Sequence, residues 1–268
     1  MTVNPTRNAT GAVVPPPPHG TLEERPAFVT EYMPIKFGST LTSRLAKRYW
    51  ERPSALNKPL LFAIEDFSAP SSMIHTRSGL PIYLYGYNWE SERGSAGRLQ
   101  ITPRKVATHR WGGKEIPSGF FDLPGTENIS AVLFSNSGTI AKFNRLGVLA
   151  GFGSKRVVVF RSGFEYDPDP DAAKPRAFRR VVGAPGYSET WAEGLDVFHN
   201  PKAKHPVDLL MLPAAAHHRL LDDGRLDSLV PTGHPVGSMT HILVAATEDE
   251  AQRLMDKVAA GGDTVLGE

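Results

Sequence analysis

Two short apolar runs constrain the fold of this chain more than any other feature. Residues 59–64 read Pro-Leu-Leu-Phe-Ala-Ile and stop abruptly at Glu65 and Asp66, and residues 129–134 are apolar apart from Ser130. Runs of this length are typical of strands that are buried on both faces of a sheet. A helix-like segment precedes the first run, and a helix followed by a buried strand is typical of α/β proteins. We therefore predict an α/β fold, with α+β as the alternative, in which helices flank a central mixed sheet.

Proline and glycine divide the chain into short elements and disfavour a helical bundle, since the sequence holds 23 prolines and 25 glycines. Residues 1–27 are rich in Asn, Thr, Gly and Pro, with four consecutive prolines at 15–18, and this composition predicts a disordered N-terminal arm. We expect a single α/β domain over residues 28–246. Residues 247–268 should form a C-terminal helix, capped by Thr247, and a tail.

Several further elements follow from local patterns. Strands are predicted at residues 156–160 and 240–245, and residues 80–87 fit either a strand or a short helix. Apolar residues recur at every fourth position of residues 39–49, which predicts a helix capped by Ser39. The helix carries a cationic flank of Arg44, Lys47 and Arg48. This flank could bind a phosphate backbone, and an ordinary solvated helix face would have the same sequence pattern.

A dense cationic segment follows the second apolar run. The alternation in residues 139–145 predicts a strand with Lys142 and Asn144 on one face and Arg145 on the other. One interpretation is a pocket for a phosphate or carboxylate, completed by His199 and Asn200 from another strand end. The other is that Lys142 and Asn144 hold neighbouring loops through backbone carbonyls, because buried polar groups must be paired.

Three residues are candidates for catalysis. Glu65 and Asp66 end a predicted central strand, where α/β proteins place catalytic carboxylates; the alternative is a helix cap or a surface charge. His199 ends another predicted strand, directly before Asn200 and Pro201. It could act as a general base or metal ligand, or it could be hydrogen-bonded in a packed turn.

No complete reaction motif is present. The glycines of residues 147–153 lead into a strand instead of a helix, and the Asp167-x-Asp-x-Asp171 segment lacks the glycine and glutamate of a calcium loop. No Gly-x-Ser-x-Gly elbow occurs. The sequence contains no cysteine, which excludes disulfides and thiolate chemistry. With a net charge of +2, no signal peptide and no long apolar run, we expect a cytoplasmic protein without a membrane partner, for which nucleic acid is an admissible partner.

Four segments together resemble one bacterial protein family. They are residues 36–50, 59–67, 127–145 and 199–201, which read Lys-Phe-Gly-Ser…Lys-Arg-Tyr-Trp, Pro-Leu-Leu-Phe-Ala-Ile-Glu-Asp-Phe, Glu-Asn-Ile-Ser…Lys-Phe-Asn-Arg and His-Asn-Pro. This uncharacterised family is sometimes labelled "glycosaminoglycan attachment site" protein. The chain's Ser-Gly pairs lack the second glycine that such an attachment site requires.

The resemblance also implies a relation to restriction-endonuclease-like folds. Longer family members carry an upstream Pro-Asp…Glu core that leads into Thr-x-Asn-Pro, and Thr2-Val-Asn-Pro5 looks like that tail. The resemblance therefore implies a truncated, catalytically incomplete nuclease-like or nucleic-acid-handling protein, which would use a divalent metal if it were active. The alternative function is a non-catalytic binding module for an anionic small molecule or a protein partner.

Overall fold

The computed structural model describes residues 1–21, 23–68, 72–95 and 97–260, and these form two compact units. Unit 1 combines Met1–Asn136 with Leu195–Val230, and unit 2 combines Ser137–Gly194 with Pro231–Glu268. Both units are assembled from segments that are far apart in the sequence.

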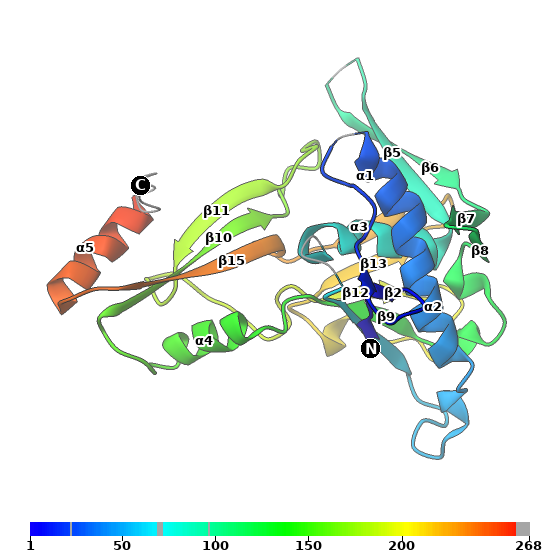
Figure 1. Cartoon of the computed structure of the whole chain (residues 1–268), viewed down its shortest axis with the longest axis horizontal. Coiled ribbons are helices and arrows are strands. Elements are labelled where there is room, and N and C mark those ends of the chain that lie inside the picture. Colours follow the sequence, from blue (N-terminus) through cyan, green and yellow to red (C-terminus); the bar gives the residue numbers. More distant parts are fainter. Residues whose placement is uncertain (22, 69–71, 96, 261–268) are drawn as a thin grey trace. The chain divides into compact units, whose positions relative to one another are not determined.

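Unit 1 is built around a six-stranded mixed sheet, in agreement with the predicted mixed α/β class (Figure 1). The strand order is β1-β4-β9-β12-β13-β14, in which β1, β4 and β9 are mutually parallel, β12 runs antiparallel to β9, and β13 runs parallel to β12. The strands are β1 Thr2–Val3, β4 Leu61–Asp66, β9 Ala131–Phe134, β12 Asp196–His199, β13 Ala216–Leu220 and β14 Leu226–Leu229. Both apolar runs therefore form neighbouring central strands, as predicted.

Helices α2, Met33–Leu45, and α3, Ser72–Tyr85, pack together in unit 1. Met33, Phe37 and Leu41 recur every four residues along α2 and are buried in the same core as the strand residues Phe62 and Val132. The two helices approach closely at Gly79 of α3, where an added Cβ would lie 2.9 Å from the Met33 Cβ. Any larger residue there would push the helices apart.

Short elements complete unit 1. They are the hairpin strands β2 Thr6–Arg7 and β3 Val13–Val14, β5 Tyr87–Arg93 and β6 Leu99–Lys105, and β7 Thr108–Trp111 and β8 Lys114–Pro117. The remaining helical segments are α1 Glu24–Ala27, η1 Phe28–Tyr32, η2 Tyr49–Glu51, η3 Phe120–Asp122, η4 Thr126–Asn128 and η5 Leu209–Met211.

The described part of unit 2 contains a three-stranded antiparallel sheet and two helices. The sheet has the order β11-β10-β15, from Arg176–Val181, Val157–Glu165 and Pro235–Val244. Helix α5, Glu248–Ala259, buries Val258 against Phe160 and Val181 of this sheet. Helix α4, Ile140–Leu149, carries the cationic segment that the sequence analysis singled out.

Residues 80–87 lie mostly in helix α3, in agreement with the helix alternative for this segment. Three local expectations require correction. Residues 139–145 form the cap and first turns of helix α4 instead of a strand. The helix predicted at residues 39–49 is α2, which begins earlier, so Ser39 is an interior residue and no cap. The disordered arm is not shown: Thr2–Val3 pairs with β4, and Val3 is buried.

The C-terminal helix is confirmed, because Thr247 Oγ1 accepts a hydrogen bond from the Glu250 amide at 3.2 Å. The tail expected after it, residues 261–268, lies outside the described residues. Among the residues that the structure covers, no helix is both long and apolar enough to cross a bilayer.

Candidate functional site

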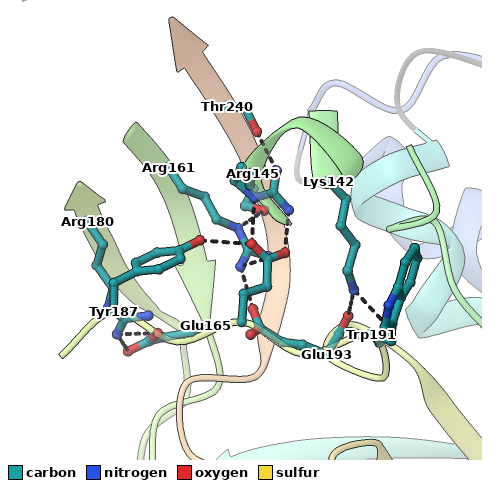
Figure 2. A network of polar contacts seen from close by, with 11 residues as sticks. Lys142, Arg145, Arg161, Glu165, Arg180, Tyr187, Trp191, Glu193 and Thr240 are labelled. Atoms are coloured by element: carbon teal, nitrogen blue, oxygen red, sulfur yellow. Dashed lines mark hydrogen bonds and ion pairs between the residues drawn. The ribbon is translucent and has the colours of Figure 1, made fainter. Parts of the chain in front are cut away.

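The cationic segment of α4 forms a polar network inside unit 2 (Figure 2). Lys142 and Arg145, one helical turn apart, are both buried, whereas Asn144 is exposed, so the predicted pairing of Lys142 with Asn144 is wrong. Lys142 Nζ donates to the carbonyl oxygens of Trp191, at 3.0 Å, and Glu193, at 2.7 Å. Burial lowers the pKa of Lys142. These are the contacts of the second interpretation, in which Lys142 holds a neighbouring loop.

Arg145 also has its partners within the unit. Its Nε and Nη2 donate to the two carboxylate oxygens of Glu189, at 2.8 and 2.6 Å. Arg161 of β10 lies 3.6 Å from the same carboxylate and pairs with Glu193. Burial opposes ionisation of Glu189, but the two arginines outweigh it and hold its pKa below the ordinary value. The two carboxylates thus compensate the two arginines, and the lysine is held by carbonyl oxygens, so such a cluster has few donors left for a ligand.

Glu65 and Asp66 end strand β4, as predicted. Asp66 is fully buried and accepts hydrogen bonds from the Ser68 amide, at 2.8 Å, and from Thr76 Oγ1, at 2.9 Å. It therefore ties the end of β4 to Ser68 and to helix α3. Glu65 Oε1 accepts a hydrogen bond from Thr2 Oγ1 at 2.7 Å, which holds the N-terminal segment against β4.

His199 ends strand β12 in unit 1, and Asn200 follows it directly. The Asn200 side chain donates to the carbonyl oxygens of Thr126 and Ile129, both at 2.8 Å, so it holds a turn together. His199 Nε2 lies 2.9 Å from His217 Nδ1. Desolvation, followed by the neighbouring His217, lowers the pKa of His199 to about 4. A histidine with so low a pKa is neutral near pH 7 and is a weak general base.

A different part of unit 1 has the composition of an anion site. A pocket of about 450 Å³ lies between residues 1–6 and helix α2. It is lined by three cationic side chains and five hydroxyl-bearing ones, and none of the described residues that line it is acidic. These residues are Lys36, Arg44 and Lys114, with Thr2, Thr6, Ser39, Thr40 and Ser43.

The helical period of α2 explains why its pocket residues lie on one face of the helix. The buried apolar residues follow each other at every fourth position, as do Lys36, Thr40 and Arg44 on an adjacent face. Lys114 reaches the pocket from β8 and donates to Ser39 Oγ at 2.6 Å. Lys36 Nζ donates to the Asn4 carbonyl and, at 3.1 Å, to Thr6 Oγ1.

The pocket cations are not neutralised by ion pairs. In the described part of the chain, Lys36, Arg44 and Lys114 form no ion pair with a carboxylate. Desolvation lowers the pKa of half-buried Lys36, the charge of buried Asp66 raises it, and Lys114 lowers it further. A bound anion would relieve the repulsion between the two lysines.

Of the cationic helix flank that we predicted, only Arg44 belongs to this pocket. Lys47 and Arg48 are exposed beyond the end of α2, and Arg48 pairs with Glu51. The sequence analysis missed Lys36 and Lys114. The four-residue spacing of Lys36, Thr40 and Arg44 was a detectable signal for the first, whereas only the tertiary fold brings in Lys114.

No group of three or more His, Asp and Glu side chains in the described residues is arranged to hold a metal ion. The carboxylates that we considered for a nuclease centre hold backbone and hydroxyl groups instead. No family model, no curated protein and no solved structure matches the chain. The resemblance drawn from four sequence segments therefore stays a prediction.

Proposed function

We propose that this chain binds a phosphorylated small molecule in the pocket between residues 1–6 and α2. The observation that carries the proposal is the convergence of Lys36, Arg44 and Lys114 on one cavity without an acidic lining residue. Cationic donors combined with hydroxyl groups suit a phosphate, because charge-assisted hydrogen bonds to its oxygens are the stronger kind. The volume falls within the range of roughly 300–1,000 Å³ that small-molecule sites occupy.

The second candidate is nucleic acid, and one observation favours it. Two further exposed cations, Lys47 and Arg48, follow the pocket residue Arg44 closely in the sequence, and together they could contact a phosphate backbone. Arg48 already has a partner in Glu51, which weakens this alternative. We limit both proposals to binding, since metal-dependent hydrolysis needs clustered carboxylates and the described residues offer none.

Salt dependence separates the two ligands. A nucleoside monophosphate should bind in calorimetry, with an affinity that falls by less than about tenfold between about 50 and 200 mM salt, because one phosphate is engaged. A fluorescent single-stranded oligonucleotide should bind no more tightly than the monophosphate. Tighter oligonucleotide binding that collapses with salt would favour the nucleic-acid alternative, and absence of binding by both ligands would refute the pocket proposal.

A further inference from the structure

Three residues on adjacent strands of the unit 1 sheet form a hydrogen-bonded chain from a buried carboxylate to an exposed hydroxyl. Asp196 Oδ1 lies 3.1 Å from His218 Nε2, and His218 Nδ1 lies 2.9 Å from Ser228 Oγ. They come from β12, β13 and β14, where His218 and Ser228 are directly opposite each other. Asp196 is fully buried, His218 is 5% exposed and Ser228 is exposed.

The arrangement determines which ring nitrogen of His218 carries the proton. A carboxylate only accepts hydrogen bonds, so neutral His218 must carry its proton on Nε2, and Nδ1 is left to accept one from the Ser228 hydroxyl. Arg77 Nε lies 2.7 Å from Oδ2 of the same carboxylate and compensates its charge. The ring is held in place by stacking on Phe198, with centroids 4.7 Å apart. The hydrogen bonds therefore run in the same direction as in a triad of a serine nucleophile, a histidine base and an orienting aspartate.

The position of Ser228 suits attack on an external substrate. Strand β14 ends the sheet order, so among the described strands only β13 pairs with it. An edge strand leaves part of its N–H groups without a sheet partner, and such groups can donate to a developing oxyanion. Ser228 lies on a strand instead of a Gly-x-Ser-x-Gly elbow, which explains why no sequence motif indicates it.

We propose that Ser228 is a nucleophile for acyl transfer from small carboxylic esters, with His218 as general base and Asp196 as the positioning residue. Ser228 Oγ forms a bond to the ester carbonyl carbon while its proton passes to His218 Nδ1. The carbon–oxygen bond to the alcohol then breaks, and the leaving alkoxide takes that proton. Water hydrolyses the acylated serine through the same relay and restores the hydroxyl. This activity is separate from the proposed phosphate pocket.

Unit 2 contains a matched control within the same chain. Ser162 Oγ lies 2.9 Å from His241 Nε2, but the described contacts give His241 no carboxylate partner. Ser162 therefore lies beside a histidine for which the described contacts show no orienting carboxylate of the kind that Asp196 provides for His218. The relay predicts that Ser228 reacts with a nucleophile-directed probe and that Ser162 does not.

The test treats the full chain with an alkyl fluorophosphonate and locates the adduct by peptide mass spectrometry. We expect one adduct on Ser228, lost in Ser228→Ala, slowed by about 100-fold or more in His218→Asn, and unchanged in Ser162→Ala. An initial burst with p-nitrophenyl acetate should follow the same pattern. The wild-type comparison of Ser228 with Ser162 needs no variant, so it stands even if His218→Asn does not fold. Absence of an adduct on Ser228, equal labelling of Ser162, or labelling that persists undiminished in folded His218→Asn would overturn the proposal.

Discussion

Lys142 and Lys36 both donate to backbone carbonyl oxygens, but their surroundings differ. Lys142 donates to two carbonyl oxygens and lies among carboxylates and guanidinium groups that compensate one another. Lys36 donates to the Asn4 carbonyl and to Thr6 Oγ1, but it lines an open pocket next to Lys114 in which no described lining residue is acidic. The sequence singled out the first lysine because cations are dense around it. Density of charge predicts burial and pairing as readily as it predicts a ligand site.

Replacing Lys142 with Met should destabilise unit 2 without affecting anion binding. The change leaves the Trp191 and Glu193 carbonyls without their donor, a loss of about 1–3 kcal/mol in the free energy of unfolding. Asn144→Met, at an exposed position of the same helix, should change it by no more than about 0.5 kcal/mol. Thermal unfolding of both variants checks this, and equal stabilities would show that the two carbonyls do not depend on Lys142.

The lowered pKa of His199 predicts a pH dependence of stability. The histidine titrates near 4 in the folded chain and near its ordinary value of 6.5 when unfolded. Between these values the unfolded state binds more protons, so stability is complete above about pH 6.5 and falls as pH drops toward 4. The loss is on the order of 2–3 kcal/mol.

Urea unfolding at a series of pH values should detect this loss in the wild type and a smaller one in His199→Gln. Glutamine keeps an N–H donor for His217 but does not titrate. Identical pH profiles for the two chains would contradict the assigned protonation of His199.

At the scale of elements, local signals were sufficient where one pattern dominated. The apolar runs predicted β4 and β9, and Thr247 with its acidic first turn predicted α5. The strand prediction for residues 139–145 was wrong because their alternation of polar and apolar residues is short and fits a helix equally well. Thr139 was the missed signal, since it caps α4 by accepting a hydrogen bond from the Lys142 amide at 3.3 Å. The helical spacing then places Arg145, not Asn144, beside Lys142.

The contribution of the Thr247 cap to the stability of α5 can be tested directly. Thr247→Ala removes the acceptor for the Glu250 amide and should cost about 1 kcal/mol. Because α5 buries Ala251 and Val258 in unit 2, faster amide exchange should be confined to α5 and the strands it contacts. Unchanged exchange of the first-turn amides would indicate that the cap contributes nothing.

At the scale of the whole molecule, the presence of a mixed sheet could be predicted, but the full set of strands that form it could not. Strand β1 joins it from the segment predicted to be a disordered arm, and β12 to β14 return after the whole insertion that forms most of unit 2. Such long-range pairings leave no local signal, because each strand is only two to six residues long. The phosphate pocket shares this property. Its residues come from the N-terminal segment, a helix and a hairpin, and the first and last of them are more than a hundred residues apart in the sequence.

The central claim, that this pocket binds a phosphate through its lysines, is tested most directly by titrating inorganic phosphate calorimetrically into three chains. The wild type should bind, and Lys36→Met/Lys114→Met should lose about tenfold or more in affinity, since each charge-assisted hydrogen bond contributes about 1.5–3 kcal/mol. Lys47→Met removes one positive charge at an exposed position outside the pocket, and it should bind as the wild type does. Equal affinity of all three chains, or equal weakening by Lys47→Met, would contradict the account.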